Sequence, residues 1–181
     1  MTEIHQVLVG AGRTDAITNM ARSLRSHLRR LGSSEIYAQH PAPGVKDVHL
    51  LQKLARSTSS KRIIIFHASG GNQAVHDFLQ ACSDPVILIF HNIAPADSFE
   101  NFDKSRTKDL RQGWEDLESL QEKVVLTVSD SQYNAHCLSD LGYKNIQVLP
   151  LGIEINQLHR LNSNAAMEYR LNREAVGPLL L

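Results

Sequence analysis

The amino-acid sequence predicts an α/β fold of the Rossmann-like, doubly wound type, with a mostly parallel sheet of about six or seven strands. Two observations carry this prediction. Short apolar runs rich in Val, Ile and Leu alternate with amphipathic helical patterns as far as about residue 150. The runs at residues 63–66 and 86–90 are continuously apolar, as expected for central parallel strands that are covered on both faces.

The first strand and helix show the two patterns most clearly. A strand is expected at residues 4–9, and a helix from about residue 15 to residue 31 follows it, with apolar residues three and four positions apart. Thr14 or Asp15 is expected to cap the start of this helix by accepting backbone N–H bonds. Gly32 is expected to end it in the left-handed conformation.

The other elements are read in the same way. Asn72 is expected to cap a helix, and residues 40–44 are expected to form a loop because two prolines lack N–H donors and fix φ. Further strands are expected at residues 36–38, 63–66, 86–90, 124–128 and 146–149, and helices at about 48–55, 72–82, 110–120 and 131–141.

Composition excludes several classes of protein. The 181 residues carry 19 Lys+Arg and 19 Asp+Glu, so no net charge favours nucleic acid as a partner. The apolar runs are far shorter than the ~20 residues of a membrane helix. The first residues lack the basic region and apolar segment of a signal peptide, and only Cys82 and Cys137 are present, so we expect a reducing compartment. The expected location is the cytoplasm, with peripheral attachment at the inner membrane face left open.

The last thirty residues differ from those before them. Residues 153–172 are polar with a weak helical pattern, and the sequence then ends in Val-Gly-Pro-Leu-Leu-Leu. We expect one domain over residues 1–152, and in residues 153–181 an interdomain linker and the start of a further, C-terminal domain. The alternative is an apolar tail that docks on its own domain. An uncovered interdomain face would favour self-association.

Ligand-binding residues are expected where parallel strands end, because loops and helix N-termini meet there. The loops concerned are residues 10–15, 67–72, 91–95 and 129–132. Two neighbouring strands both end in histidine, at His67 and His91. A buried histidine satisfied by the backbone is the alternative for either residue, but the pair favours a shared site.

The first of these loops contains Gly10-Ala11-Gly12-Arg13. A dinucleotide fingerprint is rejected, because its third glycine would fall on Asp15. A phosphate-binding turn is one interpretation, with close backbone approach at Gly10 and Gly12 and added charge from Arg13. A simple tight turn is the other. The P-loop pattern is absent from the sequence, so a P-loop NTPase is excluded.

Metal and serine chemistry are not indicated. The nine histidines include no pair four residues apart, and neither cysteine lies in a Cys-x-x-Cys pair, so we expect no metal. Ser69 follows a predicted strand, but His67 stands where the nucleophile elbow of a serine hydrolase needs glycine.

Five short stretches in a fixed order carry a family resemblance. They are residues 14–19, 66–72, 90–95, 129–134 and 148–154. Together they resemble the N-terminal, acceptor-side domain of a retaining glycosyltransferase of the group 1 family, also called family 4, which has the two-domain GT-B fold. The apolar end of the sequence is similar to the start of the C-terminal domain of that family, which holds most of the donor site.

The resemblance implies the acceptor-binding half of an enzyme that moves a sugar from a nucleotide-sugar donor to a sugar or other hydroxyl acceptor with retention. It implies no cofactor and no required metal, and an inactive isolated fragment. A complete, non-catalytic α/β module that binds a phosphorylated or sugar ligand, or a protein partner, is the alternative. The implied roles are His91 as the catalytic residue near the transferred sugar, Gly10, Gly12, Arg13 and Asp15 facing the donor phosphates, His67, Ser69, Gly71, Asn72 and Asn92 on the acceptor side, and Asp130 and Ser131 elsewhere in the cleft.

Overall fold

The computed structural model describes residues 2–57, 61–150, 152, 164–165, 169–170 and 173. The chain divides into two compact units, Met1–Leu151 and Gly152–Leu181. The first unit contains every helix and strand named below. The linker and new strand expected within residues 153–181 lie, apart from a few positions, outside the described residues.

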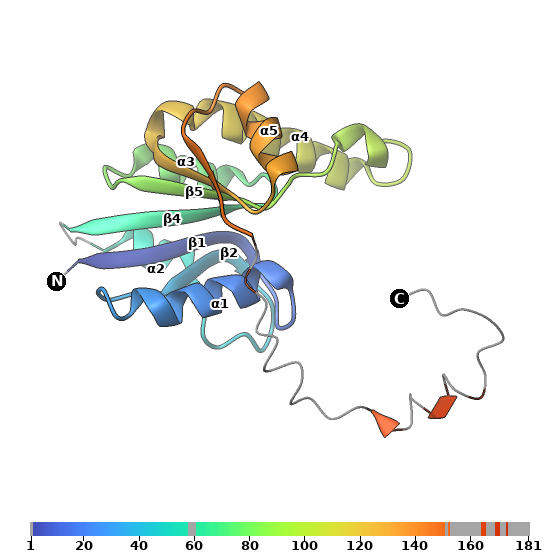
Figure 1. Ribbon diagram of the computed structural model, residues 1–181, viewed down its shortest axis with the longest axis horizontal. Helices are drawn as coiled ribbons and strands as arrows, with labels where there is room; N and C mark the ends of the chain where they lie inside the picture. Colours follow the sequence, from blue (N-terminus) through green and yellow to red (C-terminus); the bar gives the residue numbers. More distant parts are fainter. Residues whose placement is uncertain are drawn as a thin grey trace. The chain divides into compact units, whose positions relative to one another are not determined.

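The first unit is built on a seven-stranded sheet in which every pairing of neighbouring strands is parallel (Figure 1). The spatial order β3-β2-β1-β4-β5-β6-β7 changes direction along the chain between β1 and β4, as in doubly wound folds. This confirms the predicted fold class. The strands are β1 (Glu3–Ala11), β2 (Ile36–Pro41), β3 (His49–Leu50), β4 (Arg62–Ala68), β5 (Val86–Phe90), β6 (Val124–Ser129) and β7 (Ile146–Val148).

Helices cover the sheet through two separate apolar clusters. Val7 and Leu8 are neighbours on β1 and point to opposite faces, so each belongs to a different cluster. Ala21 of α1 packs in the cluster of Leu8, whereas α2, α3, α4 and α5 contribute to the cluster of Val7. The helices are α1 (Ala16–Leu28), α2 (Leu51–Ala55), α3 (Gln73–Ala81), α4 (Lys104–Ser119) and α5 (Gln132–Asp140), with short 3-10 helices η1 (Ala96–Phe99) and η2 (Gln121–Lys123).

Side-chain caps fix where helices begin, among them α1, α3 and α5. Asp15 accepts from Thr18 N at 2.8 Å, and Asn72 accepts from Val75 N at 3.2 Å. Ser131 caps α5 in the same manner. The predicted capping roles of Asp15 and Asn72 are confirmed, and each cap satisfies a backbone donor that the first helical turn leaves free.

The expected end of the first helix is wrong. The helix α1 ends at Leu28, and Gly32 does not have a positive φ. A Cβ atom at Gly32 would clash with the carbonyl oxygen of Thr2, which accepts from Ser33 N at 3.2 Å. Glycine is therefore required there by close packing against the start of the chain.

The boundaries near the second strand also differ from expectation. The strand β2 continues through His40 and Pro41, which were expected in a loop. Pro41 is tolerated as the last residue of the strand because Ala42 N supplies the bond to the carbonyl of Ala11, at 2.8 Å. The strand β3 has only two residues, too few to give a sequence pattern.

Candidate functional site

The candidate site lies at the carboxyl edge of the sheet, where the loops after β1, β4, β5 and β6 meet. All four strands run in the same direction, so their carboxyl ends share this edge (Figure 1). Ala68 is in register with Phe90, and Phe90 is in register with Ser129. The residues that follow these positions are therefore neighbours across the sheet.

A row of hydrogen-bonded side chains crosses the sheet just below this edge. His67 is fully buried, and its Nδ1 atom lies 2.9 Å from Nε2 of His91. On its other side, His67 Nε2 lies 2.9 Å from Oε1 of Gln6, which is fully buried on β1. The amide nitrogen of Gln6 donates to the carbonyl of Ala21 in α1 at 2.9 Å. The row therefore links α1, β1 and β4 to the residue that follows β5.

The Ala21 carbonyl at one end of the row determines which groups in the row donate and which accept. The Ala21 carbonyl only accepts, so Gln6 turns its NH₂ group toward it and its oxygen toward His67. A His67 ring that donates from Nε2 to this oxygen accepts at Nδ1 from the Nε2–H of His91. A neutral His91 is left with a bare Nδ1 atom at the far end of the row.

Asp130 lies beside that nitrogen. Its Oδ2 atom is 3.7 Å from Nδ1 of His91, and the other oxygen accepts from Nδ2 of Asn134 at 2.6 Å. The His91 side chain is 2% exposed and the Asp130 side chain 14% exposed. Among the described residues, Nδ1 of His91 is buried without a hydrogen-bond partner. Asp130 is thus the more exposed member of this pair.

Burial keeps both imidazoles neutral. Burial and, to a smaller extent, the neighbouring His91 together lower the pKa of His67 to about 3. Burial also lowers the pKa of His91, although Asp130 opposes this by favouring the charged ring. At neutral pH the pair therefore consists of two neutral rings next to one carboxylate.

The carboxylate of Asp15 occupies the donors of the first loop. Oδ2 of Asp15 accepts from Gly12 N at 2.6 Å and from the Thr18 hydroxyl at 2.5 Å. Partial burial raises the pKa of Asp15, but the hydrogen bonds from Thr18 and Gly12 outweigh it, so the pKa is lowered. Neither Gly10 nor Gly12 has a positive φ. The Gly12 amide is engaged within the loop, whereas Gly10 and Arg13 are exposed.

Gly71 packs against α4 instead of presenting open space. Its amide donates to the carbonyl of Asp109 at 3.2 Å, and a Cβ atom at Gly71 would lie 2.6 Å from that oxygen. A Cβ atom at Gly113 of α4 would lie 2.7 Å from the Gly71 nitrogen. Glycine is needed on both sides of this contact. Gly70 next to it has open space.

Asn72 is held on two sides besides its capping bond. Its backbone N–H donates to the buried carboxylate of Asp116 at 3.3 Å, and its side-chain nitrogen lies 3.3 Å from Nε2 of His40. Gln112 donates to the other oxygen of Asp116 at 2.8 Å. This network ties the loop after β4 to α4 and to the end of β2.

The structure sorts the expected site residues into three groups. His67, His91 and Asp130 meet in the row. A second group has structural roles in the loops and at the first turns of the helices: Gly12, Asp15, Gly71, Asn72 and Ser131. Ser69 is half-buried, and Asn92, with φ of 79°, is exposed, as are Gly10 and Arg13.

Four residues of the site region were not predicted. Gln6, Asn134, Asp116 and Gly113 support the loops or the row. The sequence offers a clue for two of them. Gln6 is an amide within a mostly apolar strand, and Asn134 stands three residues after the serine that caps a helix.

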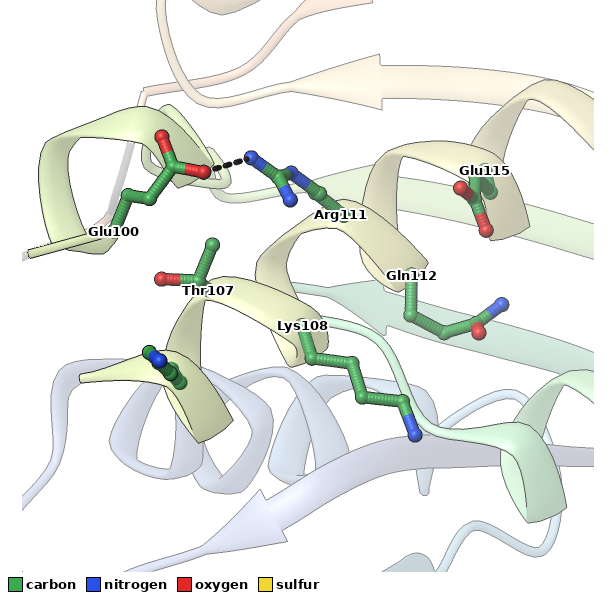
Figure 2. A pocket seen from close by; sticks show the side chains of 7 residues that line it. Glu100, Thr107, Lys108, Arg111, Gln112 and Glu115 are labelled. Atoms are coloured by element: carbon green, nitrogen blue, oxygen red, sulfur yellow. Dashed lines mark hydrogen bonds and ion pairs between the residues drawn. The ribbon is translucent and has the colours of Figure 1, made fainter.

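A separate hollow of about 470 Å³ lies on α4 (Figure 2). Arg111 there pairs with Glu100 at 3.1 Å and with Asp97 at 3.3 Å. None of the expected site residues lines it. The lining residues are Glu100, Lys104, Thr107, Lys108, Arg111, Gln112 and Glu115.

The described part of the chain has neither a metal-binding group nor a membrane-spanning helix. Its His, Cys, Asp and Glu side chains form no group of three that could hold a metal ion. Within the same residues, no helix has the length and apolar character needed to cross a membrane.

Comparison with known proteins gives a fold relationship. No protein-family model and no curated protein sequence matches the chain. A solved structure described as "alpha-glucosyltransferase (AGT) in complex with UDP" matches with a TM-score of 0.60 and 11% sequence identity, over 93% of this chain and 48% of that one. The chain therefore shares its Rossmann-like α/β fold with part of this glucosyltransferase structure. It spans about half the length of the matched structure.

Proposed function

We propose that this chain is the acceptor-binding half of a glycosyltransferase that moves a sugar from a nucleotide-sugar donor to a hydroxyl acceptor with retention. The fold likeness to a glucosyltransferase that holds UDP, over 93% of this chain, carries the proposal. The resemblance to family 4 supports it, since the first four of its five stretches lie at or next to the ends of β1, β4, β5 and β6. A second lobe would supply the other wall of the cleft and most of the donor site.

The buried row defines what this wall does at the reacting sugar. We assign His91 to the reaction through Nδ1, which lacks a partner among the described residues. Because the ring is 2% exposed, a sugar hydroxyl would meet the carboxylate of Asp130 first. The hydroxyl would donate to Asp130, with Nδ1 of His91 as a second acceptor 3.7 Å from Oδ2 of that carboxylate.

The bond changes follow from retention without a metal. The acceptor oxygen attacks the anomeric carbon as the bond from that carbon to the donor phosphate breaks, and the acceptor proton passes to the departing phosphate oxygen. Fixed dipoles that face the diphosphate stabilise its developing charge. Gly10 and Arg13 are exposed after β1 and would face that diphosphate, whereas Ser69 and Asn92 would contact the acceptor.

The reaction would take place in the cytoplasm. Cys82 and Cys137 are both free thiols, as is usual in a reducing compartment.

The direct experiment uses the full-length protein that the gene encodes. It is incubated with a panel of nucleotide sugars and simple glycan acceptors, and release of nucleoside diphosphate and the anomeric configuration of any product are measured. The proposal expects release from at least one donor and a product that keeps the donor's configuration. Binding of a sugar or a phosphorylated compound without turnover would support a non-catalytic module instead.

A further inference from the structure

The amide of Gln6 holds an unusual place for so polar a group. It lies on β1, flanked by His5 and Val7, and is fully buried. Both ends of the amide are bonded, the nitrogen to the Ala21 carbonyl and the oxygen to His67. An aliphatic side chain would fill this position without any need for partners.

We propose that Gln6 is a positioning residue, which fixes the nitrogen on which His67, and through it His91, carries the proton. The two bonds of the amide leave one orientation, with its oxygen toward His67. His67 therefore donates from Nε2 and accepts at Nδ1. His91 in turn is protonated at Nε2 and bare at Nδ1.

This order leaves two acceptors facing each other at the surface end of the row. Nδ1 of His91 and Oδ2 of Asp130 lie 3.7 Å apart, with no proton between them while His91 is neutral. Asn134 occupies only the other oxygen of Asp130, at 2.6 Å. The pair therefore selects a ligand group that brings a hydrogen, such as a hydroxyl of a sugar. This ligand class rests on the proposed function, whereas the proton order does not.

Loss of the Gln6 oxygen would reverse the order. With leucine at position 6, the Nε2–H of His67 has no acceptor, so the proton moves to Nδ1 and is donated to Nε2 of His91. His91 is then protonated at Nδ1 and donates to Asp130. The reversed row fills the gap that the ligand hydroxyl would use.

The two variants Gln6→Leu and Gln6→Glu separate positioning from packing. Glutamate in its neutral, protonated form keeps a carbonyl oxygen toward His67 and donates its O–H to the Ala21 carbonyl, so it retains the proton order. Leucine removes both. Nitrogen-15 spectra of the histidine rings in the labelled full-length protein at pH 7 report which nitrogen carries hydrogen, and no activity is needed for this readout.

The expected spectra show His91 protonated at Nε2 in the native protein and in Gln6→Glu, and at Nδ1 in Gln6→Leu. A native His91 protonated at Nδ1 overturns the proposal, and this holds even if neither variant folds. An unchanged proton position in a folded Gln6→Leu also overturns it. The expected proton positions in a protein that releases no nucleoside diphosphate would refute the proposed function and leave the positioning role intact.

Discussion

The Nε2 atom of His91 lies 2.9 Å from the Nδ1 atom of His67, and the two ring planes are within 1° of parallel. One hydrogen occupies the space between these nitrogens, so one ring donates and the other accepts. Because His67 is fully buried and no acidic side chain among the described residues bonds to it, the pair is most stable while it is uncharged.

Acid should destabilise the protein through His67. Its pKa is 6.5 in an exposed chain and about 3 in the fold, so the unfolded chain binds the proton first as the pH falls. Above pH 6.5 the neutral His67 ring costs the fold no stability. As the pH falls from 6.5 to about 3, the free energy of unfolding decreases by at most about 1.4 kcal/mol per pH unit. Urea unfolding of the native protein and His67→Gln between pH 7.5 and 5 measures this. The native protein should lose stability more steeply, and equal slopes would show that His67 does not titrate as described.

Substitution of Gly71 should destabilise the fold through its contact with α4. In Gly71→Ala the new methyl group meets the Asp109 carbonyl, so we expect a loss of about 1–3 kcal/mol in the free energy of unfolding. Gly70→Ala is the matched control, because open space surrounds that position, and its effect should stay within about 0.5 kcal/mol. Equal unfolding midpoints for the two variants would refute the packing argument.

Removal of the Asp15 carboxylate should loosen the start of α1. Asp15→Ala leaves Thr18 N without its capping acceptor and leaves Gly12 N with only its 3.1 Å bond to the Thr18 hydroxyl, which costs about 1 kcal/mol in the free energy of unfolding. Asp15→Asn keeps a capping oxygen and should remain closer to the native protein. Urea denaturation at pH 7 compares the three proteins, and a native-like Asp15→Ala would show that the cap is dispensable.

Asn92 should affect acceptor binding without affecting stability. Its φ of 79° suits glycine, so Asn92→Gly removes the side chain without backbone strain. The Michaelis constant for the acceptor is expected to rise about tenfold, corresponding to about 1.4 kcal/mol of lost binding. Asn145, with φ of 54° just before β7, offers a matched control as Asn145→Gly. A similar Michaelis constant in both variants would remove Asn92 from the acceptor site.

Sequence patterns predicted the features that depend on residues close together in the chain. The strands, the caps at Asp15 and Asn72, and the arrival of His67 and His91 at one edge all follow from local spacing and the rules of parallel sheets. The functional role of His91 stays a prediction. The pattern did not predict that the two imidazoles bond to each other or that His67 bonds to Gln6, because these contacts join residues 24 and 61 positions apart in sequence.

Contacts between segments that are distant in sequence explain the other features that the sequence did not predict. Glycine is needed at position 113 because Gly71, more than forty residues earlier in the chain, packs directly against it. Asp116 is needed because it accepts the backbone N–H of Asn72 in the same loop as Gly71. Gly32 is required by Thr2, not by the helix that it follows. A two-residue strand such as β3 gives no periodicity to detect.

The central claim is that the carboxyl edge of this sheet takes part in sugar transfer, and Asp130 tests it most directly. In the full-length protein, kcat/KM for nucleoside diphosphate release from the best nucleotide sugar is compared between Asp130→Asn and Asp140→Asn, an exposed aspartate at the end of α5. We expect Asp130→Asn to lose about 100-fold, since it removes a charge at the reacting centre, and Asp140→Asn to stay within about twofold. Native rates in Asp130→Asn, or no release from any nucleotide sugar by the native protein, would contradict the account.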